Sequence, residues 1–220
     1  MVSFPTAGAT IAPRAIGLFR DRFPGVEVTL APREPDEGLE CLKAGECDFA
    51  LTVEAGFDPI ADKAIERHHL LDDPMYVGVP AHHPAATKRR LKLKDLADEA
   101  WIMGVTRTCP DGQILQRACQ GAGFEPRLAF QSDDYVAIQG FVAAGVGVCF
   151  IPDLALVAVR DDVVIRRLEG LARSATSSPP RSPTASSRPP PPRCSTSSWQ
   201  SAPSSRQRTA HWRWRAEART

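Results

Sequence analysis

The chain has 220 residues, of which 43% are hydrophobic and 24% charged, the usual composition of a soluble globular protein. Its longest apolar run, Phe141 to Ile151, has 11 residues, fewer than the roughly 20 that a membrane-spanning helix needs. The first residues contain no basic segment followed by an apolar core, the pattern of a signal peptide. We therefore expect no membrane contact and a cytoplasmic location.

The formal net charge of +1 combines two segments of opposite charge. Residues 1–170 hold 25 acidic and 18 basic side chains, whereas residues 171–220 hold nine Arg and one acid, Glu217. The longer segment should therefore repel nucleic acid on average. None of the six cysteines belongs to a Cys-x-x-Cys pair, so we expect free thiols in a chain that is not exported.

The first 53 residues predict a β-α-β-α-β unit. Residues 2–4 and 48–53 are short apolar strands, and Val26, Val28 and Leu30 alternate with polar residues as in a third strand. Pro35 suits the start of a helix that Gly45 ends. The inner faces of the two helices are predicted from helical spacing at Ile11, Ala15, Leu18, Phe19, Leu39 and Leu42.

A second unit of the same kind follows. Strands are predicted at residues 64–70, 74–80, 101–103 and 127–131, and the second of them begins the new unit. A loop at 105–112 leads into a helix that carries Ile114, Leu115 and Ala118. Val163 to Ile165 is predicted as a strand that returns to the first unit.

The segment 130–152 carries the clearest local signals. Ser132 and Asp133 are N-cap types, Val136 and Phe141 suit an inner helix face, and Gly145 suits a helix C-terminus. Residues 146–151 are a buried strand that Pro152 ends. Such a strand-loop-helix unit places its loop at the carboxyl edge of a parallel sheet, where ligands bind.

Residues 171–220 have a different character. They contain 12 Ser, eight Pro and nine Arg but no Val, Ile, Phe or Tyr, so they cannot bury enough apolar surface to offset chain entropy. We predict disorder for most of this tail. One hypothesis is a shifted reading frame of a GC-rich gene, since Ala, Gly and Val codons read out of register give Arg, Pro and Ser. The alternative is a genuine disordered appendage.

Five segments, in this order, resemble the effector-binding domain of LysR-type transcriptional regulators over roughly residues 1–170. They are Ser3-Phe-Pro-Thr-Ala-Gly-Ala-Thr10, Phe23-Pro-Gly-Val-Glu-Val28, Leu42-Lys-Ala-Gly-Glu-Cys-Asp-Phe-Ala-Leu51, Leu93-Lys-Asp-Leu-Ala-Asp-Glu-Ala-Trp-Ile102 and Ala144-Gly-Val-Gly-Val148. The resemblance implies an α/β fold of the type II periplasmic-binding-protein class, a two-lobed clamshell with a small molecule in its cleft. We expect lobe I to comprise residues 1–76 and 160–170, and lobe II residues 77–159.

The resemblance also implies partners. The family has a winged helix-turn-helix ahead of this domain and forms dimers or tetramers. Met1 falls inside the first strand, so we expect a truncated regulator that contacts DNA only through a missing N-terminal domain. Its expected ligand is a small effector, anionic in character, and no cofactor is expected.

The candidate ligand site lies where strands end and helices begin. Thr6, Ala7 and Gly8 open the first helix, whose N–H groups and dipole favour an anion. Val105, Thr106 and Thr108 belong to a loop that opens another helix, and Arg107 can pair with an anion in bidentate fashion. Val53 and Glu54 match positions that the family uses at its cleft. Each of these can instead be an ordinary capping or surface residue, and Glu54 can also select a cation.

Other chemistry is less well supported. Cys109 lies near a helix start, where a thiolate is favoured, but it has no partner His or Cys at a telling spacing. The pairs His68-His69 and His82-His83 do not converge on a metal ion, since adjacent strand residues point to opposite faces. No common catalytic motif is present, so we expect neither a catalytic site nor a metal site. The alternatives are a free-standing periplasmic-type binding protein and, less favoured, an enzyme on the same fold.

Overall fold

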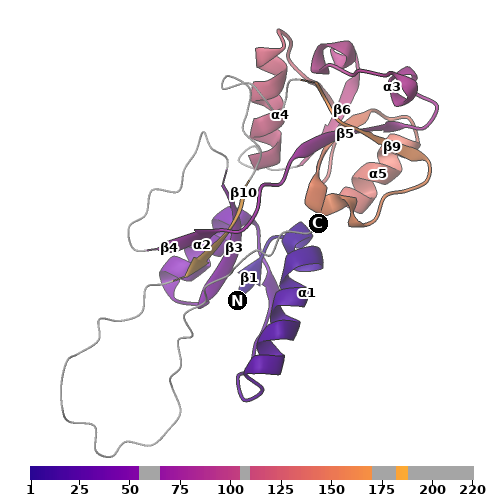
Figure 1. Ribbon diagram of the computed structural model, residues 1–220. Coiled ribbons are helices and arrows are strands. Elements are labelled where there is room, and N and C mark those ends of the chain that lie inside the picture. Colours follow the sequence, from indigo (N-terminus) through magenta and orange to yellow (C-terminus); the bar gives the residue numbers. More distant parts are fainter. Residues whose placement is uncertain (55–64, 105–109, 170–181, 188–220) are drawn as a thin grey trace, which may run out of the picture. The chain divides into compact units, whose positions relative to one another are not determined.

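The computed structural model of the chain describes residues 1–54, 65–104, 110–169 and 182–187 (Figure 1). These residues form two five-stranded sheets with strand orders β2-β1-β3-β10-β4 and β7-β6-β8-β5-β9. All of them fall within one compact unit. No helix among them is long and apolar enough to cross a membrane.

The first sheet combines parallel and antiparallel strands. Its strands are β1 (Val2–Ser3), β2 (Ala31–Pro32), β3 (Phe49–Glu54), β4 (Glu66–His69) and β10 (Ser182–Ser187). β1 pairs in parallel with both β2 and β3, which confirms the predicted β-α-β-α-β unit. Helix α1 (Pro5–Arg22) packs Ala7 and Ala12 on the face that carries Leu51, and α2 (Pro35–Ala44) packs Leu42 on the face that carries Ala50.

The second sheet is also covered on both faces. Its strands are β5 (Met75–Pro80), β6 (Ala100–Met103), β7 (Arg127–Gln131), β8 (Val148–Pro152) and β9 (Val163–Arg166). Helix α4 (Pro110–Gly121) packs Ile114 and Leu115 against Trp101, whereas α5 (Tyr135–Ala143) packs Ile138 against Ile102. Neighbouring strand residues thus face opposite layers, as the pleat requires. The short helices are α3 (Pro84–Thr87), η1 (Leu93–Leu96) and η2 (Asp153–Val157).

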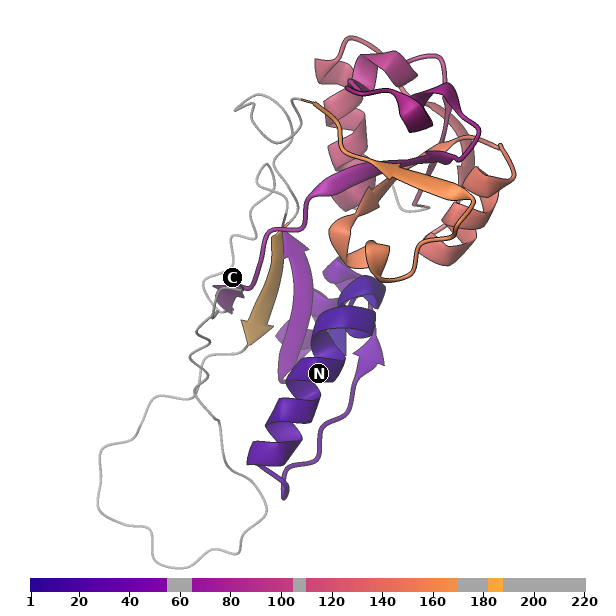
Figure 2. The same cartoon turned by 45° about the vertical axis from the view of Figure 1, so that its right-hand side comes forward.

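Two strands differ from the predicted arrangement. β9 pairs antiparallel with β5, with Gly78 opposite Ile165, so it belongs to the second sheet and not to the first lobe, where we expected residues 160–170. Within the segment predicted to be disordered, Ser182–Ser187 form β10 between β3 and β4 (Figure 2). Backbone hydrogen bonds to a strand on either side do not require apolar side chains, which explains why composition missed this strand. The other residues of 171–220 lie outside the described residues.

Several predicted placements also differ. Ala15 is exposed, Leu18 is 56% exposed and Val136 is 66% exposed, although all three were predicted on inner helix faces. The strand predicted around Val26 and Leu30 is displaced to Ala31–Pro32, and both side chains are exposed. The register explains this shift. The two residues of β1, Val2 and Ser3, pair with Ala31 and Pro32, so the strand lies at these two residues and not at residues 26–30.

Candidate functional site

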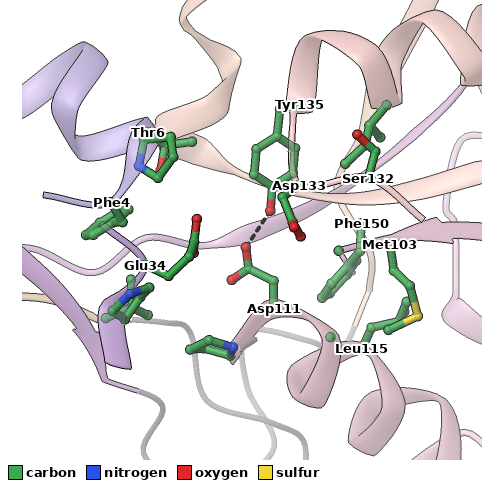
Figure 3. Close-up of a pocket in the computed structure, with 17 residues that line it drawn as sticks. Phe4, Thr6, Glu34, Met103, Asp111, Leu115, Ser132, Asp133, Tyr135 and Phe150 are labelled. Carbon is green, nitrogen blue, oxygen red and sulfur yellow. Dashed lines mark hydrogen bonds between the residues drawn. The ribbon is translucent and has the colours of Figure 1, made fainter. Parts of the chain in front are cut away.

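A pocket lies where several helices begin (Figure 3). It takes residues from the starts of α1, α2, α4 and α5, from the segment just before α5, and from three strands. The described residues that line it are Phe4, Pro5, Thr6, Glu34, Pro35, Val53, Met103, Gly104, Pro110, Asp111, Gly112, Leu115, Ser132, Asp133, Tyr135, Ile138 and Phe150. Helix N-termini present backbone N–H groups and a partial positive charge, so this position is suited to a polar ligand.

The start of α1 provides one wall. Phe4 is the N-cap residue and accepts a hydrogen bond from the backbone N–H of Gly8 through its carbonyl oxygen, at 2.9 Å. Pro5 begins the helix, a position where its missing N–H costs nothing. The first turn of α1 contains no acidic residue, whereas α2 has Asp36 and Glu37 there. Of these two helices, α1 therefore has the N-terminal dipole that is less compensated by nearby side chains.

The start of α2 adds a carboxylate to the same pocket. Glu34 forms a capping box with Glu37: its side chain accepts from the backbone of Glu37, and its own backbone N–H donates to Glu37 Oε2 at 3.3 Å. This reciprocal pair positions the Glu34 side chain at the helix start. Figure 3 shows it entering the pocket from the side of Phe4 and Thr6.

The opposite wall comes from α4, from the residues that precede α5 and from the first turn of α5. The hydroxyl of Tyr135 donates a hydrogen bond to Asp111 Oδ2, and both residues line the pocket. Asp134, one residue later than predicted, is the N-cap of α5 and accepts from the backbone N–H of Val136 at 2.8 Å. Ser132 supports this turn, because its hydroxyl accepts from the backbone N–H of Asp134 at 3.2 Å. Asp133 is exposed and also lines the pocket.

The structure brings some of the predicted ligand residues to this pocket. Thr6 and Val53 line it. Ala7 and Gly8 follow Thr6 in α1, but the Ala7 side chain is fully buried in the core and a side chain at Gly8 would meet Ser3. Glu54 is also not among the described lining residues, and its Oε1 accepts an ion-paired hydrogen bond from Arg67 Nη1 at 2.8 Å.

The predicted residues Val105, Thr106, Arg107 and Thr108 lie outside the described residues, as does Cys109. The residues on either side of them, Gly104 and Pro110, both line the pocket. Their role as ligand contacts stays a prediction.

Sequence reasoning missed the pocket's acidic and aromatic residues, chiefly Glu34, Asp111, Tyr135 and Phe150. A partial signal was present, because proline at positions 35 and 110 marks two helix starts. The contact between Tyr135 and Asp111 had no local signal, since these residues are 24 positions apart in the chain.

The described lining is acidic. It contains three carboxylates, Glu34, Asp111 and Asp133, and among the described lining residues there is no Lys, Arg or His. Three hydroxyls, of Thr6, Ser132 and Tyr135, complete its polar side chains. In the part of the chain that the structure describes, no group of three or more His, Cys, Asp or Glu could hold a metal ion.

Comparison with known proteins identifies relatives of this fold. Among curated proteins, the transcriptional dual regulator GltC of Bacillus subtilis is 30% identical over 159 residues, covering 69% of this chain and 50% of the relative. The DNA-binding transcriptional dual regulator OxyR of Escherichia coli is 28% identical over 159 residues, covering 69% and 48%. The chain thus spans about half the length of the curated relatives it matches.

Solved structures share the fold at lower identity. The CcmR regulatory domain of Synechocystis PCC6803, solved in complex with 2-PG, superposes with a TM-score of 0.71 at 23% identity and covers 85% of each chain. The BenM effector binding domain with its effector benzoate gives a TM-score of 0.70 at 22% identity, covering 85% of this chain and 81% of that one. The family model of the LysR substrate binding domain matches residues 1–184. The chain therefore belongs to the LysR substrate binding domain family, whose fold is the two-lobed, periplasmic-binding-protein-like α/β clamshell of type II.

Proposed function

We propose that this chain senses a small anionic effector for a LysR-type transcriptional regulator and binds it in the pocket where α1, α2 and α4 begin. Membership of the family supports this proposal, because domains of the family bind small-molecule effectors and its regulators are oligomeric transcription factors rather than enzymes. One observation carries the assignment to this pocket. Helix starts from both sheets converge there, and helix N-termini favour negative charge.

The anionic group belongs at the start of α1. This first turn has no acidic residue, and the hydroxyl of Thr6 lies beside it as a donor. Val53 provides an apolar contact, and the predicted contacts at Val105, Thr106, Arg107 and Thr108 extend the site from the residue after Gly104. In this proposal Ala7 and Gly8 take part through their backbone, and Glu54, whose carboxylate forms an ion pair with Arg67, contributes from the position after Val53. The two solved neighbours with bound 2-PG and benzoate support a small ligand of this kind.

Ligand binding would act on the regulator through population shift. A ligand that contacts both lobes stabilises the conformation in which both lobes contact it. It thereby shifts the equilibrium of the oligomeric regulator toward one of its two states. In this proposal the regulator is a homodimer or tetramer, DNA is contacted by a winged helix-turn-helix domain, and the chain is not an enzyme.

A thermal-shift screen of metabolite carboxylates against the purified chain tests this function. We expect at least one to raise the melting temperature, and Thr6→Val to weaken its binding by about tenfold, because a hydrogen bond to a charged group is lost. Thr29→Val, a matched change at an exposed residue outside the pocket, should leave binding unchanged. Equal binding by Thr6→Val would contradict the site, and chemical turnover of the stabilising ligand would favour an enzyme instead.

A further inference from the structure

We propose that Cys41 and Cys47 form a redox-active thiol pair, which a small disulfide such as oxidised glutathione converts to an intramolecular disulfide. This site goes beyond the proposed function, because neither cysteine lines the effector pocket. It makes the end of α2 a site of reversible covalent modification.

The end of α2 brings the two cysteines together. Gly45 adopts the left-handed conformation, and its backbone N–H donates to the carbonyl oxygen of Leu42 at 3.2 Å. The backbone N–H of Glu46 donates to the carbonyl oxygen of Cys41 at 3.0 Å. These two hydrogen bonds form a Schellman motif, which turns the chain back over the last turn of the helix. Cys47, the next residue, therefore returns beside Cys41.

The two side chains lie in one apolar layer. Cys47 is buried in the cluster that contains Val2, Leu42 and Ala50, and Cys41 packs against the same cluster. Their thiols form a hydrogen bond with each other, so the sulfur atoms are in direct contact. Both are free thiols in the structure. A disulfide needs its sulfur atoms to approach to about 2.05 Å, which rotation of two side chains already in contact can provide.

The two thiols differ in their access to solvent. Cys41 is half-buried, so a small disulfide can reach its sulfur, whereas Cys47 is buried. Desolvation, and then the hydrogen bond with Cys41, raises the pKa of Cys47 to about 11. Cys41 is therefore the thiol that attacks first, and Cys47 is the thiol that resolves the product. Modification of Cys41 removes the partner of this hydrogen bond, so Cys47 ionises more readily at the step that needs its thiolate.

The reaction consists of two thiol–disulfide exchanges. The thiolate of Cys41 attacks one sulfur of oxidised glutathione, the S–S bond of glutathione breaks, and one glutathione thiolate leaves and takes up a proton. Cys47 loses its proton to water, and its thiolate attacks Cys41 Sγ and displaces the second glutathione thiolate, which is protonated in turn. Two protein thiols are oxidised, and one glutathione disulfide is reduced to two thiols.

Peptide mapping of the full chain tests the pair. The reduced protein is incubated with oxidised glutathione, remaining thiols are alkylated with N-ethylmaleimide, and trypsin is added. Trypsin cleaves after Lys43, which lies between the two cysteines, so peptides 34–43 and 44–63 each carry one of them. We expect these two peptides to be joined by a disulfide, without bound glutathione, and to separate when dithiothreitol is added.

Three variants assign the two steps. Cys47→Ser should stop the reaction at the mixed disulfide, so that glutathione stays on Cys41. Cys41→Ser should slow glutathione attachment to peptide 44–63 by about tenfold or more relative to peptide 34–43 of Cys47→Ser, because the remaining thiol is buried and protonated. Cys194→Ser removes a thiol elsewhere in the chain and should leave the link between the two peptides unchanged. The melting temperature of each reduced variant verifies that it is folded.

Three results would overturn the inference. Glutathione remains on Cys41 of the wild-type chain while Cys47 is alkylated as a free thiol; or either cysteine is linked to another part of the chain; or both remain reduced. Each of these results leaves the proposed effector binding intact, because it concerns residues outside the pocket. Failure of the metabolite screen would likewise leave the thiol pair standing.

Discussion

Gly78 and Cys149 pair across β5 and β8, at a point where the sheet has no room for another side chain. A Cβ atom at Gly78 would lie 2.7 Å from Cys149 Sγ, which is fully buried. The sequence predicted both strands but not this contact, because their pairing register depends on residues 71 positions apart in the chain. A glycine within an apolar strand only suggests such a close approach.

The contact predicts a specific instability. Gly78→Ala should lower the free energy of unfolding by about 1–3 kcal/mol, the usual cost of overpacking a filled core. Cys149→Ala in the same chain should restore much of this loss, because it removes the sulfur atom. Urea unfolding measures both effects. Gly17→Ala is the control, since a Cβ there meets nothing within 4 Å, and it should be neutral or stabilising. Equal stability of Gly78→Ala and wild type would contradict the packing.

Burial of the same thiol predicts a pH dependence. Desolvation raises the pKa of Cys149 to about 12 in the folded protein. The pKa of a thiol in the unfolded chain is about 8.5. At pH 7 the thiol is protonated in both the folded and the unfolded state, so its ionisation does not change the free energy of unfolding there. Between these two pKa values only the unfolded state loses the proton, so the free energy of unfolding falls as pH rises. Urea unfolding at pH 7 and about 10 should therefore show a smaller decline for Cys149→Ala than for wild type. Equal declines would mean that Cys149 is not protected from ionisation.

At the scale of elements, local signals predicted helix ends better than helix faces. Pro35 and Gly45 bound α2 as predicted, and Gly45 adopts the left-handed conformation with φ of 77°. The burial of Leu42 was also predicted correctly. The exposure of Leu18 was not predicted. Helical spacing shows which side chains share a face of α1, but not which part of that face the sheet covers. β10 was missed for a related reason: its position depends on the strands on either side of it, not on its own composition.

The start of α5 gives a test at this scale. Asp134 accepts from the backbone N–H of Val136, so Asp134→Ala should lower the free energy of unfolding by about 1 kcal/mol. Asp134→Asn keeps an oxygen acceptor and should retain most of the stability. Urea unfolding compares the variants. If alanine and asparagine gave the same value, the cap would not contribute as the geometry indicates.

For the whole molecule, the order of the segments and the family could be predicted from the sequence, but the strand partners could not. β9 was assigned to the wrong sheet because the choice between two possible partners is a tertiary one. The pocket shows the same limit. Thr6 and Val53 were found because they end or begin predicted elements, whereas Tyr135 and Asp111 meet only when α4 and α5 are folded against one sheet.

The central claim is that a small molecule binds in the pocket where these helices begin. Hydrogen–deuterium exchange of the full chain, with and without a saturating ligand from the metabolite screen, tests it most directly. The predicted result is slower exchange in peptides that contain Phe4 to Thr6, Glu34 and Pro35, Met103 to Leu115, and Ser132 to Ile138. Exchange in β4 and β9, which do not line the pocket, should be unchanged. Protection confined to β4 or β9, with none at the four helix starts, would contradict the account.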